Sequence, residues 1–568
     1  MAVMLALVMV LGSFSAVFAD DNKTITLENG KAGHTYTLYQ ILVGDVNAEN
    51  ELQLDNIQWG NGVTDAFKAS KGTAAAYAKD IADANDARAT ARELVYAGAL
   101  QNGKAVTMDA DGPVVFSGLA EGYYIVVDEN GNTEAVDGDF SSEYIVQVVN
   151  NVSMELKGQP TTAEKKVLDT EDMNVTLDVS ELKNVDGDWQ DSADHDFGDA
   201  VPFKLTANLA NNVQSYAKYH VTLEDKQAAG FDAPTKWYVT VLDLEFEIDN
   251  TTTTASKKTA NGTIVTVTKS VPAGKTFAIK VELEQENPVT AEVKNPANPD
   301  ETMTVITSNL ADGNSAVVTV KYTSVLNRSA NIGKTGNLNE LVCKYSNNPE
   351  ERQEGKAGED EGETPEDYVK VFTYKTEVDK VDETGAALKG AVFTLYKEVL
   401  EDAEGAVLGS EIKKGFGKDV KATKLADNKY YKVVACEPIN DDTTNFEFRG
   451  IDDGKYVLVE TTIPKGYNAV EAEEFEIVAG HDYTAVDPQL LTFTADPFTA
   501  SKEDGNITTP KGNTHDIESG EAYAEIENNS GSVLPETGGI GTTILYTLGG
   551  ILVVGAGVLL VARRKMER

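Results

Sequence analysis

Two all-β stretches in the later part of the chain share a set of side chains that could react with one another. In each, a Lys stands in the first predicted strand, an acid in a middle strand and an Asn in the last. Burial lowers the pKa of a Lys amine toward its nucleophilic form and raises that of a carboxyl group. The protonated acid can polarise the Asn carbonyl and relay protons while ammonia leaves. The pattern predicts a Lys–Asn amide bond, formed because the fold holds the groups in contact.

Strand alternation indicates which of these side chains face the core. Glu460 places a charge in the otherwise apolar run 456–461, although an outward Glu at a strand edge is the alternative. In the run 341–347, period two puts Leu341, Cys343, Tyr345 and Asn347 on one face. That face is apolar, so Asn347 should point toward the core and needs a partner.

Both ends of the chain have the composition of targeting segments. Residues 2–18 form a short apolar run that ends in small residues at the positions that signal peptidase reads, so residues 1–19 are predicted to be a signal peptide cut after Ala19. At the other end, an apolar run at 540–562 has the length of a transmembrane helix, and the basic tail after it is expected in the cytoplasm. A pentapeptide precedes this run: Leu534, Pro535, Glu536, Thr537 and Gly538.

Charge and cysteine content exclude several functions. The net charge is -43, without a basic stripe to offset it, so nucleic acid is not expected as a partner. The two cysteines, Cys343 and Cys436, fall in different predicted domains. An exported chain of 568 residues without a disulfide needs another staple if it resists force or proteases.

Composition shifts divide the chain into segments. Residues 20–158 read as strands around an Ala-rich helix at 73–100, and 159–349 as a second, all-β domain. The Glu/Gly-rich segment 350–368 is expected to be a solvated linker before a third β domain at 369–531, and 532–568 is the targeting segment.

An acidic run in the second domain has the residue type of a calcium site. It contains Asp186, Asp188, Asp191, Asp194 and Asp196 but lacks the spacing of a known calcium loop. The sequence favours a solvated turn there, and neither a metal nor a cofactor is expected.

The C-terminal segment resembles the cell-wall sorting signal of Gram-positive surface proteins. The Leu-Pro-Glu-Thr-Gly motif, the apolar run and the basic tail stand in the right order. The resemblance implies that a sortase cuts between Thr537 and Gly538 and passes the threonine carbonyl to an amine. Expected partners are therefore pilus-assembly and housekeeping sortases and peptidoglycan, and the exported chain is expected to be anchored to the cell wall.

The domains resemble those of sortase-assembled pilins. The pieces 388–396, 454–461 and 464–467 resemble the B-type domain of collagen-binding adhesins, and 322–349 resembles the isopeptide-forming second domain of fimbrial backbone subunits. The first domain resembles an N-terminal pilin domain. The implied fold is mainly β: tandem immunoglobulin-like, collagen-adhesin B-type β-sandwiches, with a helical insert in the first domain and a C-terminal transmembrane helix.

This resemblance assigns the reacting residues by position. The third domain receives Lys380, Glu460 and Asn528, with Asn528 fitting the family position better than Asn529. The second receives Lys166, Asp199 and Asn347. Lys165 stays open beside Lys166 because adjacent strand residues point to opposite faces, so only one of the two can enter the core.

A separate lysine would join subunits to one another. Lys157 stands just before the hinge at 159–162, where the family places its pilin lysine, although the surrounding residues depart from the usual family motif. An ordinary solvated lysine is the alternative.

The sequence thus predicts a non-enzymatic structural subunit of a covalent surface pilus, joined to copies of itself and stapled by internal Lys–Asn bonds. Adhesion to a host surface ligand is compatible with this reading, but no ligand is indicated. The alternative is a monomeric, wall-anchored adhesin with a multi-domain stalk. No constellation supports a surface enzyme.

Overall fold

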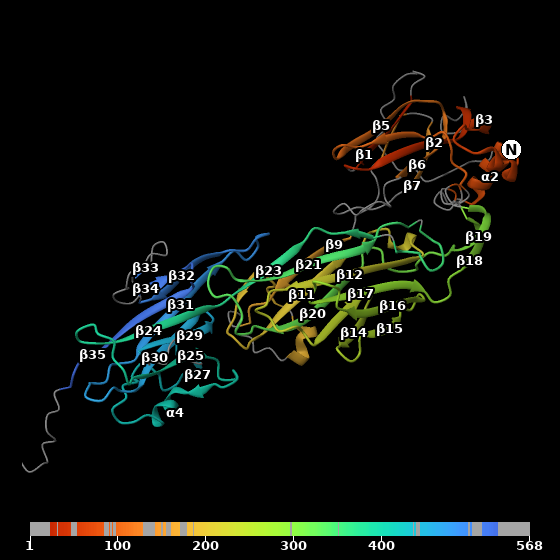
Figure 1. Cartoon of the computed structure of the whole chain (residues 1–568). Helices are drawn as coiled ribbons and strands as arrows, with labels where there is room; N and C mark the ends of the chain where they lie inside the picture. Colours follow the sequence, from red (N-terminus) through yellow and green to blue (C-terminus); the bar gives the residue numbers. More distant parts are fainter. Residues whose placement is uncertain are drawn as a thin grey trace, which may run out of the picture.

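The protein is seen in a computed structural model as a row of β domains (Figure 1). The structure describes residues 23–531 apart from 31, 47–53, 85–89, 91–93, 95–97, 129–142, 149–150, 155–160, 171–178, 186, 296–297, 350, 360, 435–436, 439–443, 498–499 and 502–513. The expected mainly β architecture of tandem domains is confirmed. No helix within these residues is long and apolar enough to cross a membrane. The expected signal peptide and the run at 540–562 lie outside the described residues.

The first domain combines two sheets with a short helical segment. One sheet has the order β5-β1-β8, and the other has the order β3-β2-β6-β7 with β4 also on β2. The two helices close one core, where the rings of Phe67 and Tyr77 pack with Trp59. The elements are β1 Lys23–Gly30, β2 Thr35–Val46, β3 Leu54–Trp59, α1 Asp65–Lys71, α2 Ala74–Ala84, β4 Lys104–Thr107, β5 Gly112–Leu119, β6 Gly122–Asp128, β7 Glu143–Val148 and β8 Val152–Met154.

The first part of the Ala-rich stretch forms the helix α2, Ala74–Ala84. Ala favours helix, and Tyr77 and Ile81, four residues apart, bury one face of α2. The remainder of the helix expected at 73–100 falls mostly outside the described residues.

The second domain is a sandwich of two sheets. One has the order β14-β13-β20-β11-β9, and the other has the order β10-β23-β21-β12-β17-β16-β15, with β22 also on β21. Its strands are β9 Thr162–Val167, β10 Ser192–Asp194, β11 Ala200–Asn208, β12 Lys218–Gln227, β13 Lys236–Val241, β14 Leu244–Asp249, β15 Thr254–Lys258, β16 Thr263–Ser270, β17 Phe277–Gln285, β18 Thr290–Asn295, β19 Asn298–Ile306, β20 Val317–Val325, β21 Asn337–Ser346, β22 Glu361–Glu363 and β23 Asp367–Phe372, with 3-10 turns at Val179–Asn184 and Val213–Ser215.

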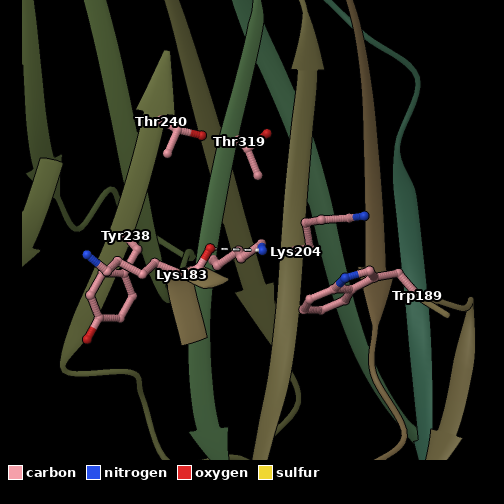
Figure 2. Close-up of a pocket in the computed structure, with 7 residues that line it drawn as sticks. Lys183, Trp189, Lys204, Tyr238, Thr240 and Thr319 are labelled. Carbon is pink, nitrogen blue, oxygen red and sulfur yellow. Dashed lines mark hydrogen bonds between the residues drawn. The ribbon is translucent and has the colours of Figure 1, made fainter. Parts of the chain in front are cut away.

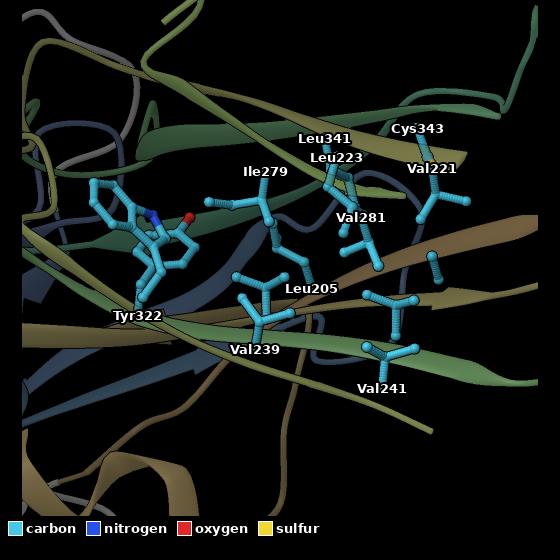
Figure 3. Close-up of a cluster of buried hydrophobic side chains, with 14 of the residues drawn as sticks. Leu205, Val221, Leu223, Val239, Val241, Ile279, Val281, Tyr322, Leu341 and Cys343 are labelled. Atoms are coloured by element: carbon cyan, nitrogen blue, oxygen red, sulfur yellow. The ribbon is translucent and has the colours of Figure 1, made fainter. Parts of the chain in front are cut away.

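Side chains from both sheets interdigitate in the core of this domain (Figure 3). Leu205, Val239 and Tyr322 come from one sheet, and Ile279 and Cys343 come from the other. Each fully buried aliphatic side chain contributes about 1.5–3 kcal/mol to this packing. Cys343 is fully buried, as its place on the strand predicts, and burial raises the pKa of its thiol, which keeps it protonated.

The segment expected to be a solvated linker instead folds onto the second domain. Strands β22 and β23 both pair with β21, so this domain extends to Phe372. The buried Arg352 donates hydrogen bonds to backbone carbonyls of Ser215, Ile306 and Pro349. A run of Glu and Gly predicted solvation, but one buried guanidinium and two strands fix the segment in place.

The third domain is a second sandwich. Its sheets have the orders β28-β29-β24-β35-β34-β33 and β26-β27-β25-β30-β31-β32. Its elements are β24 Tyr374–Asp382, β25 Val392–Val399, β26 Val407–Leu408, α4 Gly409–Lys414, β27 Tyr430–Val434, β28 Glu437–Pro438, β29 Asn445–Ile451, β30 Gly454–Thr462, β31 Glu473–His481, β32 Leu490–Asp496, β33 Ala500–Ser501, β34 Thr514–Asp516 and β35 Glu521–Asn528. The first strand, β24, and the last, β35, are parallel neighbours.

Candidate isopeptide sites

Lys380, Glu460 and Asn528 meet in the core of the third domain. Lys380 lies on β24 and Asn528 on β35, where the register pairs Lys380 with Ile526 and Asp382 with Asn528. Period two therefore places Lys380, Ile526 and Asn528 on the same face of this sheet. Glu460 lies on β30 of the facing sheet. All three side chains of the triad are buried, whereas Asn529 is exposed.

Hydrogen bonds define the geometry of this triad. Lys380 Nζ donates to the carbonyl oxygens of Val381 at 2.8 Å and Ile526 at 2.7 Å. Asn528 Nδ2 donates to Glu460 Oε1 at 2.9 Å and Oε2 at 3.2 Å. Asn528 Oδ1 is buried and receives no hydrogen bond. A protonated Glu460 could donate to that oxygen if the amide turned over.

Burial shifts both titratable groups toward the forms that the reaction needs. It lowers the pKa of Lys380 to about 8, although the Glu460 carboxylate opposes the shift. It also raises the pKa of Glu460, against the hydrogen bond from Asn528 and the charge of Lys380. Burial thus favours the neutral amine of Lys380 and the protonated acid of Glu460 over their charged forms.

The residues expected in the second domain do not come together. Lys166 Nζ contacts Asp191 Oδ1 at 2.6 Å and Glu164 Oε1 at 3.0 Å on the outer face of its sheet. Asp199 accepts a hydrogen bond from the Asp196 backbone. Asn347 is buried, but it follows the end of β21. The three side chains have separate surroundings. The structure therefore does not bring Lys166, Asp199 and Asn347 together as predicted.

Lys165 is the lysine that enters the core. The register pairs it with the buried Leu205, whereas Lys166 pairs with Lys204, so Lys165 shares the inward face of the sheet. Its Nζ lies 2.5 Å from Asp225 Oδ2 and 3.3 Å from the carbonyl oxygen of Glu340. Burial lowers the pKa of Lys165 and raises that of Asp225, while the attraction between the two groups opposes both shifts.

Tyr322 connects this pair to an asparagine. Its hydroxyl donates to Asp225 Oδ2 at 2.6 Å and accepts from Asn339 Nδ2 at 2.9 Å. Asn339 is fully buried, and its Oδ1 receives no hydrogen bond. The neighbouring Asn337 instead bonds the backbone through both ends of its amide. Lys165, Asp225 and Asn339 thus form the arrangement that can react, with Tyr322 between acid and amide.

The sequence pattern could have shown that Asn339 faces the core. Extending the alternation of 341–347 backward by one step places Asn339 on the same face as Leu341 and Cys343. The alternation of β12 likewise places Asp225 on the face of Val221 and Leu223, although the polar residues around it weaken this signal.

A surface hollow of about 270 Å³ lies apart from these triads (Figure 2). Lys204 stands over the ring of Trp189, with its Nζ 5.0 Å from the ring centroid. The lining contains lysines but no acid or asparagine, so it cannot perform the same chemistry: Lys183, Trp189, Lys204, Tyr238, Thr240, Thr319 and Lys321.

Lys157 and the pentapeptide from Leu534 to Gly538 lie outside the described residues. The last described residues are held against the third domain, where Ser530 donates to Glu383 through its backbone and its hydroxyl, at 3.2 and 2.7 Å. The structure therefore fixes the chain up to Gly531, three residues before the pentapeptide begins.

Comparison with known proteins identifies two parts of the chain. Residues 374–489 match the family profile of the SpaA prealbumin-like fold domain, and residues 526–568 match the LPXTG cell wall anchor motif. The expected wall anchoring at the cell surface and the resemblance to Gram-positive pilins are confirmed.

The trypsin-resistant surface T6 protein of Streptococcus pyogenes serotype M6 is 25% identical over 292 residues, covering 43% of this chain and 48% of the relative. The match thus spans about half the length of that relative. Among solved structures, the T6 backbone pilin of serotype M6 Streptococcus pyogenes has a TM-score of 0.46 at 16% identity and covers 91% of this chain and 100% of its own. The full-length major pilin SpaD of Corynebacterium diphtheriae has a TM-score of 0.42 at 16% identity, covering 90% and 97%.

Proposed function

We propose that this wall-anchored chain is a structural subunit of a covalent pilus, polymerised by sortase and stapled inside its second and third domains by Lys–Asn amide bonds. The observation that carries the proposal is the burial of Lys380, Glu460 and Asn528 in one core, where Lys380 donates to the Ile526 carbonyl on the strand of Asn528 and Asn528 donates to Glu460. Burying a lysine, an acid and an amide together is costly unless they are paired, and here the partners are the groups of an amide-forming reaction.

The reaction in the third domain balances without any outside reagent. The neutral amine of Lys380 attacks Cγ of Asn528, so an Nζ–Cγ bond forms and the Cγ–Nδ2 bond breaks. Glu460 protonates the amide oxygen, transfers the proton of the attacking amine to the leaving nitrogen, which departs as ammonia, and regains its own proton from the oxygen as the carbonyl re-forms. Water is excluded because all three side chains are buried.

The second domain supports the same reaction between Lys165 and Asn339. Asp225 takes the role of the acid, and Tyr322 can relay a proton between Asp225 and the amide because its hydroxyl contacts both. The rings of Phe203 and Tyr322, whose centroids lie 5.7 and 5.8 Å from Lys165 Nζ, keep the amine in apolar surroundings.

Bonds between subunits would use other groups. A sortase would cut between Thr537 and Gly538 and transfer the threonine carbonyl to Lys157 of the next copy. A final transfer to peptidoglycan would fix the polymer to the wall. The anchor motif at 526–568 supports the cleavage step, whereas the choice of Lys157 depends on its place before the hinge.

The internal bonds are tested by the intact mass of the exported chain. We expect a mass lower than calculated by two ammonias, and Asn528→Ala and Asn339→Ala should each prevent one of the two losses. Peptide sequencing of the native material should recover the joined pairs 380–528 and 165–339. The full calculated mass would contradict both bonds.

Polymerisation is tested separately from the internal bonds. Wall extracts run on denaturing gels should show a ladder of large species that Lys157→Ala abolishes and that the exposed control Lys104→Ala leaves unchanged. A single band from the unaltered protein would favour the monomeric adhesin, even if the internal bonds are present.

A further inference from the structure

The joint between the second and third domains buries an acidic cluster. The sequence favoured a solvated turn for the acidic run ending at Asp196, but Asp191, Asp194 and Asp196 are buried against the third domain. The Asp191 backbone N–H donates to the Tyr483 carbonyl at 2.9 Å. The prediction of a solvated turn is therefore wrong for these three acids, which form a contact between the domains, whereas Asp188 is exposed. The carboxylates gathered here are those of Asp169, Asp194, Asp196, Asp452 and Asp453.

Asp196 forms ion pairs with the two lysines of this cluster. Its Oδ2 is 3.2 Å from Lys397 Nζ and also contacts Lys432, and its Oδ1 accepts from the Asp452 backbone at 2.7 Å. Lys397 also lies 3.5 Å from Asp452 Oδ2. Two lysines thus face five carboxylates, and an excess of negative charge remains.

Asp194 is the acid for which this environment is least favourable. It is 2% exposed, and its Oδ2 makes no hydrogen bond of ordinary geometry, although Asp169 and the Tyr374 hydroxyl lie beside the carboxylate. The nearest ring nitrogen, His481 Nε2, lies 3.5 Å away and contacts the Tyr374 hydroxyl at 2.8 Å.

Oxygen atoms of three acids from both domains converge at this point. One carboxylate oxygen each of Asp194, Asp452 and Asp453 lies within 4.8 Å of the others. Asp194 ends β10 in the second domain, and the other two form the turn between β29 and β30 in the third. Since the ligands are more than 250 residues apart, no local motif could have revealed them.

We propose that Asp194, Asp452 and Asp453 bind a divalent cation of the Ca²⁺ class between the two domains. A hard cation prefers oxygen ligands, and Ca²⁺ accepts irregular cages completed by water better than Mg²⁺, which demands near-ideal octahedral geometry. Asp453 is only half-buried, which gives water and the ion access. The ion would offset the excess negative charge and tie the end of β10 to the third domain.

The test uses the whole exported chain, stripped with a chelator and then titrated calorimetrically with Ca²⁺. One ion per chain should bind, and thermal unfolding should shift upward by several degrees, with a smaller shift for Mg²⁺. Asp453→Asn should weaken Ca²⁺ binding at least tenfold. The control Asp188→Asn, an exposed acid of the same run, should bind as the unaltered chain does.

A reversal of sign distinguishes the ion site from a merely destabilised variant. In chelator, Asp194→Asn should unfold at a higher temperature than the unaltered chain, because it removes repulsion between the acids. In Ca²⁺ the order should reverse. No binding heat, or an equal Ca²⁺ shift in Asp453→Asn, would overturn the proposal. So would a chain stabilised only by acid, since that result would mean that Asp194 is simply protonated.

Discussion

The second and third domains place the same three kinds of side chain differently across their sheets. In the third domain, Lys380 and Asn528 lie on neighbouring strands of one sheet and Glu460 reaches them from the other. In the second, Lys165 lies in one sheet, whereas Asp225 and Asn339 lie in the facing sheet. A bond in the third domain would therefore join two strands, and a bond in the second would join two sheets. Burial of the amine and the acid is common to both, so the proposed chemistry would depend on burial and contact rather than on one topology.

The largest effect is expected from Lys165→Ala. It removes the cross-link between sheets and leaves Asp225 buried without its partner, which should lower the free energy of unfolding by about 5 kcal/mol. Chemical denaturation and intact mass measure the two consequences. Lys166→Ala is the matched control for the cross-link, because Lys166 pairs with Glu164 and Asp191 outside this core, and it should leave the ammonia loss unchanged with a smaller loss of stability. The reverse ranking would restore Lys166 as the reacting residue.

Glu460→Gln tests the acid of the third domain at nearly constant shape. We expect the bond to Lys380 to fail, because Gln cannot relay protons, with a loss of about 4 kcal/mol from the missing cross-link. Mass spectrometry should show one ammonia retained, while the second domain still loses its own. The exposed Glu476→Gln serves as the control. Complete bond formation in Glu460→Gln would show that contact alone suffices.

Tyr322→Phe tests the tyrosine that links acid and amide in the second domain. The triad of Lys380, Glu460 and Asn528 has no such residue. Removing the hydroxyl breaks the contact between Asp225 and Asn339, which should slow bond formation and cost about 1 kcal/mol in stability. The fraction of chains that have lost ammonia, followed over time after refolding, measures the rate. Tyr238→Phe, on a neighbouring strand, should not change it. An unaltered rate in Tyr322→Phe would limit Tyr322 to a structural role.

A pH dependence of stability should be visible only when the third-domain bond cannot form. In Asn528→Ala, Lys380 keeps a pKa of about 8 in the folded state against 10.5 for an ordinary lysine. Between these values the unfolded chain binds more protons, so stability should rise with pH across this window. Denaturant titrations at several pH values measure the slope. Adding Lys380→Met should flatten it, and an equal slope in the double variant would assign the effect to another group.

The sequence predicted the third-domain triad better than the second-domain one for a physical reason. Glu460 stands in an apolar strand, where a charge is conspicuous, and Asn528 closes the last strand of the domain. In the second domain, the choice between Lys165 and Lys166 depends on which of them faces Leu205 across β9 and β11, and that register is a property of the sheet rather than of the local run.

The local sequence pattern also could not predict the contact between the second and third domains. Acid-rich and Gly-rich segments are usually solvated, which is why the run near Asp194 and the segment 350–368 were both predicted to be exposed. Each is held in place by partners distant in sequence: Asp452 and Tyr483 for the first, and Ser215 and Ile306, through Arg352, for the second.

The parallel pairing of β24 with β35 determines how the third domain bears tension. The chain enters at one end of this strand pair and leaves at the other, so pulling on the two termini slides the strands along each other. Their backbone hydrogen bonds are then strained together in shear instead of being opened one at a time. A domain built in this way resists extension before any covalent staple is added, and a staple between these same two strands would carry the load past everything folded between them.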